Sequence, residues 1–113
     1  HHPPFSSSEH ANDANTLSLR EELVPFFESF GVDFVFSGHD HVYERLQKNE
    51  VNYIIAGAAG APLYKKVVES PYSKLFAAKY NYTVLTATAD KLFLRAYDDA
   101  GSLIDEHSVE RLN

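Results

Sequence analysis

The sequence predicts a mixed α/β domain in which parallel strands lead into an antiparallel strand meander. A helical spacing of apolar residues occurs in the first third of the chain, and a β-prone stretch follows it directly. The remainder reads mostly as short strands separated by turn residues. With 113 residues, of which 44% are hydrophobic, the chain is long enough for one packed domain and too short for two.

Composition excludes several classes of protein. The formal net charge of -6 lacks the Lys/Arg excess that nucleic-acid binding requires, and no run of about 18 apolar residues could span a bilayer. We therefore expect a soluble chain with neither nucleic-acid nor membrane partners. The sequence has no cysteine, so any metal must be held by histidine, carboxylate or amide. Because the chain opens at His1 without an initiator methionine or a signal-like segment, we expect it to be part of a longer polypeptide.

The first predicted element is a helix that follows a polar loop. Residues 1–17 show little apolar periodicity, and Ser18 and Glu21 have the spacing of a capping box, so the helix should begin at Ser18. Gly31 can end it in the left-handed conformation. Pro25 lies too deep for the first turn, so either the helix kinks there or it begins later. The apolar face expected to join the core comprises Leu19, Leu23, Phe26, Phe27 and Phe30.

Strands account for most of the remaining chain. Residues 32–36 are a β-prone run that reads as a buried strand ending at Ser37-Gly38, and the small-residue loop 57–62 should let two backbones approach closely. Residues 65–79 give no clear pattern beyond a short helix at 73–78. Two hairpins and a final strand complete the pattern: segments 42–47 and 51–56 around Asn49-Glu50, segments 80–88 and 91–97 around Ala89-Asp90, and segment 103–109.

Two histidines follow the predicted buried strand. In extended backbone the spacing of His39 and His41 would point both imidazoles to one side, with Asp40 facing away. Alone, this pair fits a metal site and ordinary surface histidines equally well. The opening His1 and His2 lie on a loop expected at the same edge of the sheet, where the carboxyl ends of parallel strands gather ligands. We therefore expect a histidine-rich metal site there.

Taken together, these motifs resemble the calcineurin-like metallophosphoesterases, in particular their purple acid phosphatase branch. The resemblance rests on His-His-Pro-Pro-Phe-Ser-Ser from His1, on His10, and on Gly-His-Asp-His-Val-Tyr-Glu-Arg from Gly38, and it extends to about Tyr64 and to the final strands. It implies the C-terminal half of a metallophosphoesterase β-sandwich flanked by helices. Residues 1–113 would then be the C-terminal portion of one domain whose N-terminal half is absent.

The resemblance also implies roles for individual histidines. His1 and His39 are similar to ligands of the second of two metal ions, and His41 is similar to a ligand of the first. His10 resembles the imidazole that contacts the substrate phosphate and protonates the leaving alkoxide, so it is the expected catalytic and substrate-binding residue. The implied cofactors are two divalent or trivalent ions, iron with zinc, manganese or a second iron. The implied substrate is a phosphate ester.

Other polar residues have two interpretations. Tyr43, Glu44 and Arg45 could face the substrate, but an alternating strand of this kind more often provides cross-strand packing and an ion pair, so we expect them to support the histidine loop. The loop 57–60 could cradle phosphate, yet no helix follows it, so a tight turn beneath the site is favoured. The sequon at Asn81 is interpreted as chance.

Several ligands of the family are missing from this sequence. Its Gly-Asp-x-x-Tyr and Gly-Asn-His blocks do not occur, and Asp105-Glu106-His107 matches its Asp-x-His block only as a string in a polar terminal segment. The expected enzyme is therefore a full-length, acid phosphatase-like parent, with the N-terminal half as the partner of this chain. The alternatives are a non-catalytic fragment or interaction module that retains a half-site, and a phosphodiesterase of the same superfamily. The resemblance alone favours secretion or a periplasmic location.

Overall fold

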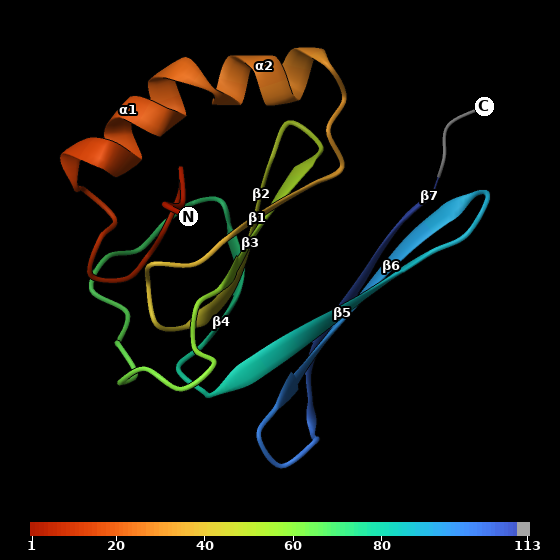
Figure 1. The fold of residues 1–113 in the computed structure, drawn as a ribbon. Coiled ribbons are helices and arrows are strands. Elements are labelled where there is room, and N and C mark those ends of the chain that lie inside the picture. The colour runs from red at the N-terminus through yellow and green to blue at the C-terminus, as the bar shows by residue number, and fades with distance from the viewer. Residues whose placement is uncertain (111–113) are drawn as a thin grey trace.

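The computed structural model describes residues 1–110, which fold into three layers (Figure 1). Two helices cover one side of a four-stranded sheet, and a three-stranded sheet lies on its other side. The predicted α/β class with a terminal antiparallel meander is confirmed. In chain order the elements are α1 (Ala14–Glu22), α2 (Val24–Ser29), β1 (Phe34–Ser37), β2 (Tyr43–Lys48), β3 (Val51–Ala56), β4 (Ser73–Ala77), β5 (Asn81–Ala87), β6 (Lys91–Asp98) and β7 (Leu103–Glu110).

The first sheet has the order β1-β3-β2-β4, with β1 parallel to β3 and the other pairs antiparallel. The β2–β3 hairpin turns where it was predicted, because Asn49 and Glu50 both adopt the positive φ angles that a tight hairpin turn needs. The second sheet, β5-β6-β7, is the predicted meander.

Two apolar cores hold the layers together. The core beneath the helices and the amino-terminal loop includes Phe5, Val24 and Tyr53, and the core between the sheets joins Tyr43 and Ile54 to Leu94 and Ala96. Burial of apolar side chains on both faces explains why β3 is an uninterrupted apolar run except for one asparagine.

The helix begins earlier than the capping-box spacing predicted. Asp13 is the N-cap of α1, so Ser18 lies inside that helix. Pro25 neither kinks α1 nor ends it, because it occupies the first turn of the separate helix α2, where a missing N–H leaves no bond unmade. Leu23, Phe26 and Phe30 are 40%, 59% and 80% exposed, so the expectation that they join the core is wrong for these three residues.

Two further expectations need correction. Residues 73–78 form strand β4 rather than a short helix, because pairing with β2 decides the conformation of a segment whose local sequence favours neither. Strand β1 is less buried than predicted, since it lies at an edge of the described sheet and leaves Phe36 43% exposed. Gly31, by contrast, has the predicted left-handed conformation, with φ of 64°. Neither described helix is long and apolar enough to cross a membrane.

Acid should weaken the packing around His107. Burial lowers the pKa of His107 below its usual value of 6.5, and the nearby Arg45 charge adds to this while Asp105 opposes it. The unfolded chain then binds a proton more readily than the native one, so the free energy of unfolding falls as pH drops below about 6.5. Urea denaturation between about pH 7 and pH 5 should show a shallower loss for His107→Gln than for the wild type. Equal pH dependence in both proteins would contradict this prediction.

Candidate metal site at the edge of the sheet

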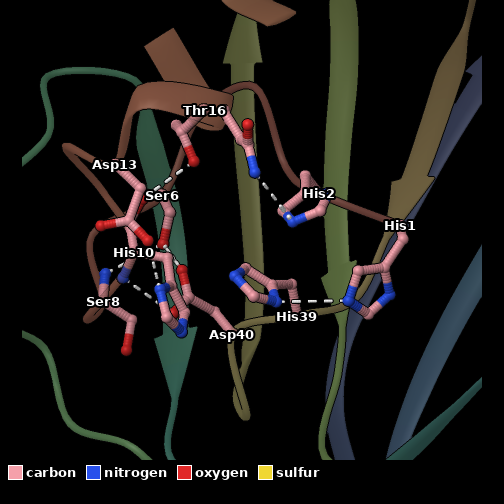
Figure 2. Close-up of polar contacts among 10 residues, drawn as sticks. His1, His2, Ser6, Ser8, His10, Asp13, Thr16, His39 and Asp40 are labelled. Carbon is pink, nitrogen blue, oxygen red and sulfur yellow. Dashed lines mark hydrogen bonds and ion pairs between the residues drawn. The ribbon is translucent and has the colours of Figure 1, made fainter.

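Four histidines from two distant segments meet at the carboxyl end of β1 (Figure 2). The carbonyl of His1 accepts the Gly38 N–H at 2.9 Å, which fixes the start of the chain beside the turn that follows β1. The ring nitrogens of His1 and His39 then lie 3.2 Å apart. We call His1, His2, His10 and His39 the histidine cluster.

Within this cluster, His1, His2 and His39 each offer a nitrogen within 4.8 Å of the others, close enough to share a metal ion. His2 was not among the ligands expected from the resemblance, yet its ring centroid lies 4.4 Å from that of His39. The consecutive histidines at the start of the chain were the available sequence signal for this proximity.

The two imidazoles of the His-x-His pair do not point the same way, contrary to the extended-backbone argument. His39 has φ of 67°, and this left-handed conformation turns its ring toward His1 and His10. His41 instead stacks on Tyr64 with ring centroids 4.1 Å apart, and its Nδ1 lies 2.7 Å from the Pro62 carbonyl oxygen. His41 therefore falls outside the metal-sized groups found among residues 1–110.

Within the histidine cluster, His10 lies beside His39 on the side away from His1 (Figure 2). Its ring lies 3.8 Å from that of His39, centroid to centroid, and its Nδ1 lies 2.5 Å from Oδ2 of Asp13. His10, Asp13 and His39 form a second group of metal-ligating types. Sequence reasoning assigned Asp13 no role, although its position three residues after His10 was a visible signal.

Two fully buried carboxylates hold the loop that carries His10. Asp40 accepts hydrogen bonds from the Ser6 hydroxyl and, at 3.1 Å, from the His10 N–H. Glu44 accepts from the Ser7 N–H at 2.8 Å and from the Ser73 hydroxyl at 2.6 Å. The loop was predicted, but the burial of its serines was not. The available sequence signal for this burial was the pair of acidic residues, Asp40 and Glu44, that follow the predicted buried strand.

Tyr43 and Arg45 point away from the histidine cluster, toward the second sheet. Asp105 accepts from the Tyr43 hydroxyl at 2.6 Å and from the Arg45 Nε–H at 2.8 Å. Burial raises the pKa of Tyr43 well above its usual range, and Asp105 adds to this, so the phenol stays a hydrogen-bond donor. Asp105 thus joins the two sheets.

The loop after β3 packs directly beneath the turn that bears His39. A Cβ placed on Gly57 would lie 1.9 Å from the Asp40 carbonyl oxygen, so the predicted close backbone approach is confirmed. In the second sheet, Asn81 is 6% exposed and donates to the Lys79 carbonyl, which makes the sequon a poor glycosylation acceptor.

The environment of His39 favours its neutral form. Burial lowers its pKa, and the neighbouring His10 and His2 lower it further, while Asp40 and Asp13 oppose the shift. A neutral imidazole presents the lone pair that a metal requires. The described chain is therefore a mixed α/β protein with a histidine cluster suited to metal at the carboxyl edge of its sheet.

Sequence relatives match part of this chain. None of the known protein-family models matches the sequence. The chain is 36% identical over 63 residues to purple acid phosphatase 1 of Ipomoea batatas, and 41% identical over 44 residues to purple acid phosphatase 15 of Arabidopsis thaliana. These matches cover 55% and 39% of the chain, and only 13% and 8% of the two relatives. The similarity is to proteins of the phosphoesterase superfamily.

A solved structure shares the fold over nearly the whole chain. GAP50, the anchor in the inner membrane complex of Plasmodium, aligns with a TM-score of 0.86 at 21% identity, over 98% of this chain and 35% of its own. Vps29 aligns less closely. The Cryptosporidium parvum protein gives a TM-score of 0.47 at 17% identity, over 91% of this chain and 46% of its own. A zinc complex of Vps29 from Entamoeba histolytica gives a TM-score of 0.46 at 18% identity, over 88% of this chain and 48% of its own.

Proposed function

We propose that this chain is the histidine-bearing, C-terminal half of a metal-dependent phosphoester hydrolase of the purple acid phosphatase type. The observation that carries the proposal is the convergence of His1, His2 and His39 at the carboxyl end of a β-strand. The partial sequence similarity to two purple acid phosphatases supports it. The substrate class that we propose is the phosphate monoester.

The donor set of the histidine cluster fits a metal ion of this class. Imidazole nitrogens without thiolate suit zinc, iron or manganese, and His39 is held in the neutral form. We assign His1 and His39 to one ion, with His2 within reach, and His41 to a neighbouring ion. Bound ions of this kind activate water and polarise the phosphoryl group. We assign His10, stacked on His39, to contact the phosphate and protonate the leaving oxygen.

The composition of the cluster supports the view that it is one half of a site. Among residues 1–110, the group of His1, His2 and His39 contains no carboxylate and the group of His10, Asp13 and His39 contains one, whereas a pair of metal ions requires several anionic ligands to balance its charge. We propose that an N-terminal half of the same domain supplies them. The chain would then act together with that half, and alone it would lack turnover.

Turnover and metal content of the full-length polypeptide test this function. With p-nitrophenyl phosphate as substrate, His41→Ala should abolish turnover and reduce the metal content. His10→Ala should lower turnover by about 10²- to 10⁴-fold with the metal content unchanged, because it removes the proton donor and no ligand. His107→Gln is the control, since that imidazole lies between the sheets.

Three outcomes would contradict these assignments. Metal loss in His10→Ala would overturn its role as a proton donor outside the metal shell. Full metal content without phosphatase turnover in the wild type would favour the non-catalytic alternative. Preference for diesters over monoesters would favour a phosphodiesterase.

A further inference from the structure

We propose that Asp13 is a positioning residue for His10. Its carboxylate oxygen lies 2.5 Å from Nδ1 of the imidazole, and Figure 2 shows both residues on the side of the cluster away from His1. The proposal goes beyond the assignment of His10 and depends on the proposed function only for its effect on turnover.

The side chain of Asp13 does not cap the helix that it precedes. Asp13 is the N-cap of α1, where an aspartate normally accepts a hydrogen bond from the first turn of the helix. No such side-chain bond forms here. The carboxylate turns back to His10 instead, so the chain forgoes a common stabilising bond in favour of this contact.

Other contacts already hold the main chain and one ring face of His10. Asp40 accepts its backbone N–H, and its carbonyl accepts the Thr16 hydroxyl at 2.9 Å. The ring stacks on His39 at 3.8 Å. These contacts hold the main chain and one ring face, but they leave open which nitrogen faces outward. Among residues 1–110, only the hydrogen bond to Asp13 decides which ring nitrogen faces outward.

The contact with Asp13 also selects the tautomer of the His10 imidazole. A carboxylate accepts and cannot donate, so Nδ1 must carry the hydrogen of this bond. Nε2 is then the nitrogen left to face a substrate oxygen, and as a general acid His10 carries a second proton on Nε2 and gives it to the leaving oxygen, while Nδ1 keeps its hydrogen on the bond to Asp13. Without Asp13 the ring can rotate or exchange its tautomer, and the reactive nitrogen is no longer held in one place.

The tautomer can be measured on this chain without turnover. Long-range ¹H–¹⁵N correlation NMR of the ¹⁵N-labelled chain should show His10 with its hydrogen on Nδ1. Asp13→Ala should move the signal pattern toward the Nε2–H form, whereas Asp13→Asn, which keeps an acceptor oxygen, should largely retain the wild-type pattern. Glu9→Ala is the matched control, because it removes a neighbouring exposed carboxylate of the same loop.

In the full-length polypeptide, Asp13→Ala should lower kcat by about 10- to 100-fold with metal content and KM little changed, as expected for loss of an orienting partner. Asp13→Asn should recover most of this loss. An unchanged tautomer in Asp13→Ala, or an altered tautomer with unchanged kcat, would overturn the proposal. If the wild-type polypeptide shows no turnover, the proposed function is wrong. The NMR result would still decide whether Asp13 orients the ring of His10.

Discussion

Replacing Gly57 with alanine is expected to destabilise the protein severely. The added Cβ would lie 1.9 Å from the carbonyl oxygen of Asp40 and 3.0 Å from its carbonyl carbon. Both are backbone atoms, so no side chain can rotate away to make room. The two segments are also tied together by the hydrogen bond from the Gly57 N–H to the Val42 carbonyl, at 3.1 Å. We expect a loss of about 3 kcal/mol or more in the free energy of unfolding.

Urea denaturation of Gly57→Ala beside Gly38→Ala gives the comparison. Gly38 lies on the facing segment, but a Cβ there would approach its neighbours no closer than 3.9 Å, which is ordinary contact. Its replacement should therefore cost much less. Similar stability of the two variants would show that the loop after β3 can shift, and that the close approach is not required for folding.

The parts of the fold that local sequence determines were predictable. The turn at Asn49-Glu50 and the left-handed Gly31 were predicted from asparagine and glycine, the residue types that admit positive φ most readily, although Glu50 also adopts a positive φ that its own type disfavours. The close approach at Gly57 followed from a run of small residues. In each case asparagine or glycine permits a conformation or a close approach that other residue types disfavour, so the signal is local.

The errors arose where individual contacts outweigh the periodic pattern of the sequence. The spacing of Ser18 and Glu21 suggests a cap, but the helix begins at Ala14, after the N-cap Asp13, whose carboxylate bonds to His10. Strand β4 exists because β2 offers it a partner. Neither contact leaves a periodic trace in the sequence, so propensity alone could not place these elements.

The sequence predicted which residues gather at the candidate site better than it predicted how their side chains are oriented. Residue types and their position after a strand were enough to bring His1 and His39 to one edge of the sheet. The divergence of His41 was not predictable, because it depends on the left-handed conformation of His39 and on the ring of Tyr64. A two-residue spacing predicts a shared face only if the intervening backbone is extended.

Replacing Asp40 with alanine should release the loop that carries His10. The carboxylate is fully buried and accepts both the Ser6 hydroxyl and the His10 N–H, so its removal leaves one buried and one part-buried donor without their acceptor. Hydrogen bonds to a charged group contribute about 1.5 to 3 kcal/mol, and we expect a total loss of about 2 to 4 kcal/mol because part of the loop can rehydrate.

Two matched variants separate the contributions of these bonds. Asp40→Asn keeps the size of the side chain and one acceptor for the His10 N–H, so it should lose less stability than Asp40→Ala. Ser6→Ala leaves the carboxylate of Asp40 in place and removes two hydrogen bonds of the Ser6 hydroxyl. These are the bond that it donates to Asp40 and the bond that its oxygen accepts from the Ser8 N–H at 3.0 Å. Hydrogen exchange should report faster opening at the His10 amide in Asp40→Ala than in either. If that amide stays as protected as in the wild type, the loop is held by Glu44 and its serine partners, and Asp40 is not its anchor.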